Sequence, residues 1–131
     1  MELHLKIIGY ILIVLALIHV MFPKYFNWVT DLKPLSLINR QMMYVHTFFI
    51  ALTVFLMGLL CVTCTNELIH STLGKKICIG LAIFWAARLF IQFYGYSSQL
   101  WRGKKTETAV HIMFTFMWTY FTVVFSSIAK A

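Results

Sequence analysis

Arg88 lies in the middle of an apolar stretch, residues 84–94, which also contains Gln92. A permanently charged guanidinium near the centre of a membrane span costs roughly 2.5–3.5 kcal/mol, so such a residue normally faces protein and marks a functional site. Gln92 lies four residues after Arg88, which is one turn along the same face of a helix. We therefore expect a polar site built around these two side chains.

Three histidines, His19, His46 and His111, lie near the ends of the other apolar runs. At about 1.5 Å per helical residue, these histidines and Gln92 all lie roughly 5–6 Å from the same face of a helical bundle. Imidazole binds zinc, copper and iron, and three histidines around one open position form a common metal site. We therefore take the three histidines as candidate metal ligands.

Haem is a second cofactor that these histidines could bind. Two imidazoles on different helices can bind the iron of haem b, and Arg88 or Arg40 would then pair with a propionate. No HxxxH or HExxH spacing occurs in the sequence, so both hypotheses depend on how the helices come together. Haem b and a transition metal ion (Zn, Cu or Fe) are the candidate cofactors.

The same polar groups also suit a ligand that contains no metal. Arg88, Gln92 and the histidines can bind the carboxylate, phosphate or quinone head of a small amphipathic molecule, with aromatic side chains as walls. In the last apolar run, a polar stripe with helical spacing extends from Glu107 to Thr122. The candidate ligand-binding residues are Arg88, Gln92, Trp85, Tyr96, Trp118, Thr115, Asn39, Arg40 and Glu107.

A role without any ligand is the alternative. In membranes, a single histidine or threonine commonly forms a hydrogen bond between two helices. The protein would then be a non-catalytic accessory subunit or an oligomeric scaffold, in which polar residues only specify helix packing. The three cysteines also have two possible roles. They could form a disulfide or thiolate site, or they could fill apolar space, as cysteine commonly does. These residues are Cys61, Cys64 and Cys78.

The elements that must position these residues are long apolar helices. The chain has 131 residues, of which 61% are hydrophobic and 11% charged, against about a quarter charged in an average globular protein. Pro23 ends the first apolar run, and Ser36 is suited to cap the second helix. The pattern predicts an all-α membrane protein, with transmembrane helices at about 3–22, 37–64, 76–97 and 108–129.

Short connections between four spans predict an antiparallel up-down-up-down bundle, which forms a single domain over residues 1–131 with both termini on one side. The formal net charge is +7, but the Lys and Arg residues are scattered at helix ends, which fits lipid headgroups better than nucleic acid. Loops 23–37 and 97–107 lie on the more basic face, which favours a cytoplasmic location for them.

No P-loop, dinucleotide-binding turn or serine nucleophile motif occurs in the sequence. The expected partners are the lipid bilayer, a small amphipathic ligand and other membrane subunits or a second copy of the chain; nucleic acid is not expected.

Overall fold

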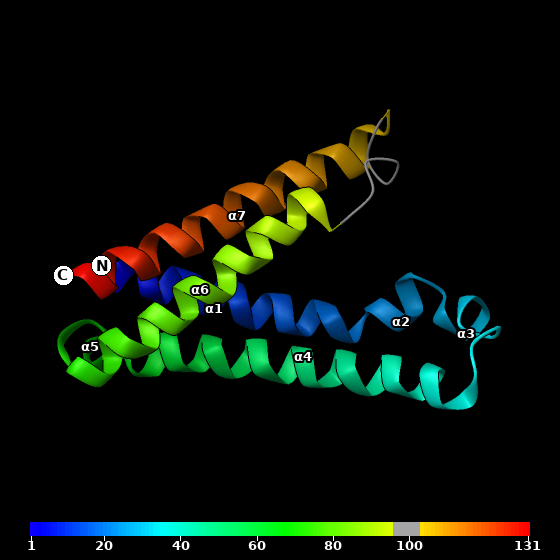
Figure 1. Cartoon of the computed structure of the whole chain (residues 1–131), viewed down its shortest axis with the longest axis horizontal. Coiled ribbons are helices and arrows are strands. Elements are labelled where there is room, and N and C mark those ends of the chain that lie inside the picture. Colours follow the sequence, from blue (N-terminus) through cyan, green and yellow to red (C-terminus); the bar gives the residue numbers. More distant parts are fainter. Residues whose placement is uncertain (96–102) are drawn as a thin grey trace. The chain divides into compact units, whose positions relative to one another are not determined.

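The computed structural model describes residues 1–95 and 103–131. Within this part of the chain the only regular secondary structure is helical, which confirms the all-α prediction (Figure 1). The helices are α1 (Glu2–Val20), α2 (Phe22–Tyr25), α3 (Trp28–Asp31), α4 (Leu37–Thr63), α5 (Thr65–His70), α6 (Thr72–Tyr94) and α7 (Lys105–Lys130).

Four of these helices, α1, α4, α6 and α7, are long and apolar enough to cross a membrane. They contain 19, 27, 23 and 26 residues, and at about 1.5 Å per residue even α1 is close to the roughly 30 Å thickness of a bilayer core. The four helices are therefore compatible with a multi-pass membrane protein. The up-down order of all four, the single domain and the orientation of the loops remain predictions.

Several helix ends differ from those predicted. The first helix ends at Val20 instead of residue 22, and Pro23 lies in the first turn of α2, where its missing N–H costs no hydrogen bond. α6 begins at Thr72, before the predicted start at residue 76, because Ser71 caps it: the Ser71 Oγ accepts a hydrogen bond from Gly74 N at 2.8 Å. Similarly, α7 begins at Lys105, before the predicted residue 108. Polar residues thus form the first turns of both helices.

The chain divides into two compact units. The first, here called the α1–α4 unit, holds residues 3–65, and the second, the α6–α7 unit, holds residues 1–2 and 66–131. In the α1–α4 unit, α1 and α4 approach each other closely at Gly9 and Gly58. A Cβ atom added to Gly58 would lie 2.8 Å from the carbonyl oxygen of Gly9. Small residues allow such close contact between apolar helices.

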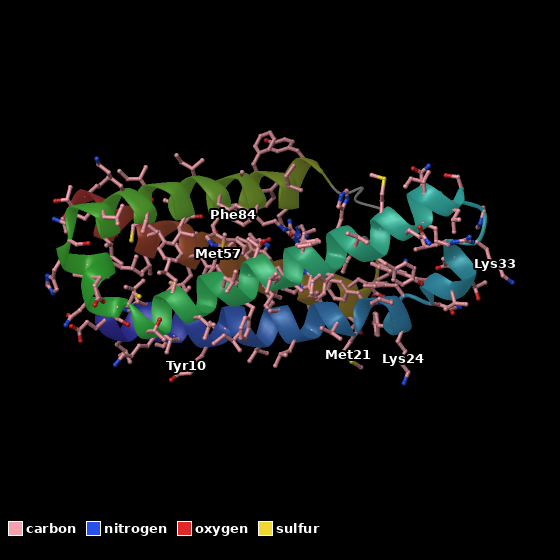
Figure 2. The ribbon with its side chains drawn as sticks, turned by 90° about the horizontal axis from the view of Figure 1, so that it is seen from below. Tyr10, Met21, Lys24, Lys33, Met57 and Phe84 are labelled. Carbon is pink, nitrogen blue, oxygen red and sulfur yellow. The ribbon has the colours of Figure 1, made fainter. Side chains whose placement is uncertain are left out.

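The segment between α1 and α4 folds into the two short helices α2 and α3. Asn27, which separates them, has a left-handed backbone with φ of 55°, a conformation that asparagine tolerates well. Trp28 is buried and packs edge-on against Tyr44 of α4. Figure 2 shows Lys24 and Lys33 projecting outward from this segment, as expected for cations beside a headgroup layer.

In the α6–α7 unit, the two long helices are antiparallel. Lys75 Nζ near the start of α6 donates to the carbonyl oxygen of Ala131 at the end of α7, whereas Gln92 near the end of α6 contacts His111 near the start of α7. The contact surface is strongly aromatic, with Trp85, Trp118 and Phe121 all buried. This pairing brings together the polar side chains of α6 and α7.

Candidate polar site between α6 and α7

Gln92 is the centre of a group that we call the α6–α7 polar cluster. It contains Gln92, the side chains Arg88, His111 and Trp118 that are hydrogen-bonded to it, and Trp85, whose ring stacks on Trp118. The Gln92 side chain is only 5% exposed. Its Oε1 accepts hydrogen bonds from Arg88 Nη1 at 3.4 Å and from Trp118 Nε1 at 3.3 Å. Its Nε2 lies 2.8 Å from His111 Nδ1. One amide therefore links three other side chains and joins the two helices.

The sequence builds this cluster through helical spacing. Trp85, Arg88 and Gln92 follow one another at intervals of three and four residues on α6, and His111 and Trp118 are seven residues apart on α7. Residues at these intervals share one face of a helix. The contacts of Trp85 with Trp118 and of Gln92 with His111 show that these two faces meet.

Arg88 is half-buried, and its charge lies against an aromatic face. The guanidinium carbon is 5.1 Å from the centre of the Trp118 ring, within the roughly 6 Å range of cation–π attraction. The expectation that Arg88 has a polar protein partner is met by Gln92. The cluster thus holds a positive charge beside an indole ring and an amide oxygen.

Two aromatic rings stack with Trp118. The Trp85 and Trp118 rings are parallel within 9°, with centres 5.0 Å apart, and Phe114 stacks with Trp118 at 5.4 Å. Phe114 is not among the predicted site residues, although it precedes Trp118 by one helical turn. Phe93 also packs edge-on against the His111 ring at 6.3 Å. These rings form an apolar wall beside the polar groups.

The two stacked indoles differ in their hydrogen bonding. Trp118, which is 3% exposed, donates its N–H to Gln92. Trp85 is 2% exposed, and among the described residues its Nε1 has no hydrogen-bond partner. A buried N–H without an acceptor costs free energy because it has given up its hydrogen bond to water.

Four of the remaining candidate ligand residues lie in the described part of the chain: Thr115, Glu107, Asn39 and Arg40. The Thr115 hydroxyl donates to the carbonyl oxygen of His111 within α7, and Glu107 is exposed in the first turn of that helix. Asn39 and Arg40 belong to the first turn of α4, in the α1–α4 unit. Tyr96 lies outside the described residues. None of these assignments to a ligand site is tested by the structure.

The three candidate metal ligands are divided between the units, with His19 and His46 in the α1–α4 unit and His111 in the α6–α7 unit. His19 Nδ1 donates to the carbonyl oxygen of Leu15 at 2.8 Å, and His46 is exposed. Residues 1–95 and 103–131 contain no group of three or more His, Cys, Asp or Glu side chains that could hold a metal ion. The shared metal or haem site of the three histidines therefore remains a prediction.

The cysteines are thiols in this structure, and none forms a disulfide. Cys61 and Cys78 are fully buried, and Cys78 Sγ makes a weak contact of 3.9 Å with the carbonyl oxygen of Leu68. This environment is that of a small apolar core residue.

No protein-family model matches this sequence, and no curated protein or solved structure matches it either.

Proposed function

We propose that this chain is a multi-pass integral membrane protein that binds the head group of a small amphipathic molecule at the α6–α7 polar cluster. The observation that carries the proposal is the indole N–H of Trp85, which is buried and has no acceptor among the described residues. Leaving such a donor unpaired costs about 1–3 kcal/mol. A bound head group that accepts this hydrogen bond would remove the penalty.

The surroundings of Trp85 support an amphipathic ligand. Arg88 follows Trp85 by one helical turn and brings a positive charge to the cluster, while Phe121 packs edge-on against the Trp85 ring at 5.2 Å. A few polar groups set in an aromatic wall are typical of small-molecule sites. Both α6 and α7 are apolar enough to cross a membrane, so the tail of a ligand at their cluster would lie in an apolar environment.

The test is to purify the protein in discs of native membrane, extract bound molecules and identify them by mass spectrometry. We expect one class of small molecule to be enriched over bulk lipid. Trp85→Phe keeps an aromatic ring but removes the N–H, and loss of one hydrogen bond of about 1.4 kcal/mol lowers retention roughly tenfold. Absorbance and elemental analysis of the same sample test haem and metal directly.

Trp28→Phe is the matched control, because Trp28 is another buried tryptophan but belongs to the α1–α4 unit. This variant should retain the bound molecule as the wild type does, with helix content checked by circular dichroism. The proposal is wrong if the wild-type extract has the composition of bulk membrane lipid, or if Trp85→Phe retains as much of the enriched molecule as the wild type.

The second candidate function is an accessory subunit or scaffold in which the cluster only fixes helix packing. Two hydrogen bonds of the single Gln92 amide, with His111 and with Trp118, favour it, since they link α6 to α7 without any ligand. An extract without an enriched molecule would favour this role.

A further inference from the structure

The orientation of the Gln92 amide is determined by its neighbours. An arginine guanidinium and an indole nitrogen are hydrogen-bond donors only. Both Arg88 Nη1 and Trp118 Nε1 contact the same Gln92 atom, at 3.4 and 3.3 Å. That atom must be the carbonyl oxygen Oε1, so the Gln92 Nε2 amino group is the donor that points to His111.

The amide orientation in turn determines the proton position on His111. Its Nδ1 lies 2.8 Å from the Gln92 amino group and must accept that hydrogen bond. A neutral imidazole has one nitrogen that accepts and one that carries the proton. The proton of the neutral His111 ring is therefore on Nε2, and any group that contacts this nitrogen must be an acceptor.

A metal ion at His111 Nε2 would break this arrangement. Binding through Nε2 requires a lone pair there, which moves the ring proton to Nδ1. That proton would face the Gln92 amino group, which is also a donor, so no hydrogen bond would form. Turning the amide would instead direct its amino group toward the N–H groups of Arg88 and Trp118, which are donors as well. Trp118 is only 3% exposed, so water cannot easily replace the lost acceptor.

From these contacts we infer that the site takes a ligand whose head group is an oxygen acceptor, such as a carboxylate, a phosphate or a quinone carbonyl, and that the neutral His111 ring acts in this site as an N–H donor and not as a metal ligand. The inference rests on the proposed function. The buried Trp85 N–H and the positive charge of Arg88 agree with it, because both groups favour acceptors and the charge repels cations.

His19 provides an internal control for the proton position. Its Nδ1 donates to the carbonyl oxygen of Leu15, so its proton is on Nδ1, opposite to that of His111. In protein labelled with nitrogen-15 histidine and held in lipid discs at a pH where the rings are neutral, directly bonded proton–nitrogen pairs identify the protonated nitrogen. His111→Gln assigns the His111 signal by removing it.

We expect an Nε2–H signal for His111 and an Nδ1–H signal for His19 in the wild type. Gln92→Glu preserves the shape of the side chain but replaces the donor by an acceptor, so His111 should gain a proton on Nδ1 while His19 is unchanged. A wild-type His111 with its neutral proton on Nδ1 would overturn the inference, whatever the ligand.

The head group is tested with palmitate, hexadecyl phosphate and a short-chain quinone as acceptors, and hexadecylamine as the matched donor. Each is titrated while the His111 signal is followed. At least one acceptor should bind at least tenfold more tightly than the amine, and the acceptor that binds best identifies the source of the oxygen. Zn²⁺ alone should leave the Nε2 proton in place.

The outcomes separate this inference from the proposed function. If the amine binds as tightly as the best acceptor, or if Zn²⁺ displaces the Nε2 proton, the acceptor specificity is wrong but ligand binding at the cluster stands. If the wild type binds none of these compounds and retains no molecule on purification, both are wrong.

Discussion

Replacing Gln92 with leucine removes the side chain that links the other hydrogen-bonding groups of the α6–α7 polar cluster. Leucine has a similar size, so the change mainly removes polar contacts. The Gln92–His111 bond at 2.8 Å has ordinary length, whereas the bonds from Trp118 and Arg88 at 3.3 and 3.4 Å are longer and share one oxygen. Because usual N–H···O distances are about 2.7–3.2 Å, we expect the His111 bond to be the strongest of the three.

The loss of stability caused by Gln92→Leu depends on whether each hydrogen-bond partner of Gln92 can replace the bond it loses. Hydrogen bonds between membrane helices contribute about 0.6 kcal/mol on average and at most about 1.7 kcal/mol. Arg88 and His111 are half-buried, so they can reach water or headgroups by snorkelling. Trp118 is 3% exposed, so after the substitution its indole N–H stays buried without the Gln92 acceptor, which adds a penalty of about 1–3 kcal/mol. We therefore expect a net destabilisation of about 2 kcal/mol, most of it from Trp118.

A double-mutant cycle with Trp118→Phe isolates that contribution. In the Trp118→Phe background the indole N–H is already absent, so Gln92→Leu should cost about 1–2 kcal/mol less than it does in the wild type. The assay is reversible unfolding of the solubilised protein by sodium dodecyl sulfate, followed by circular dichroism.

Thr119→Val is the matched control for this cycle. The Thr119 hydroxyl is exposed and bonds only within α7, to the carbonyl oxygen of Thr115, so its loss should change stability by less than about 0.5 kcal/mol. Two outcomes would refute the view that the Gln92 amide stabilises the helix pair. One is that the stability changes of Gln92→Leu and Trp118→Phe are additive. The other is that Gln92→Leu destabilises the protein no more than the control does.

Two further predictions concern the helices that carry the site. Gly58→Ala should destabilise the protein by about 1–3 kcal/mol, because the new methyl group would lie 2.8 Å from a backbone oxygen of α1. Gly80→Ala is the control, since a Cβ atom there would have no atom within 4 Å, and it should be neutral or stabilising. Equal effects of the two variants in the same unfolding assay would contradict the close approach of α1 and α4. Ser71→Ala should cost about 1 kcal/mol of stability through loss of the α6 cap. Ser36→Ala should cost less, because the capping hydrogen bond of Ser36 in α4 is 3.4 Å long, against 2.8 Å for Ser71. A lower thermal midpoint for Ser36→Ala than for Ser71→Ala would contradict this order.

The sequence by itself determined the helices and one face of the site. Apolar runs of membrane length predicted the four long helices, because a run of such residues must be buried or face lipid whatever its partners are. Ser36 was identified as a cap from its position before an apolar run, and its Oγ does accept the Asn39 N–H. Arg88 and Gln92 were placed together because the four-residue spacing is a property of one helix.

Only the tertiary structure decided which groups Gln92 contacts and how they share its hydrogen bonds. Depth along a helix placed His111 near the level of Gln92, but depth does not determine the direction of a side chain around the helix axis, and His19 bonds to its own helix at Leu15. The stacking of Trp85 on Trp118 depends on how α6 and α7 pack against each other. Hydrogen bonding and ring stacking require atoms from different parts of the chain to meet at specific distances, and sequence spacing does not encode those distances.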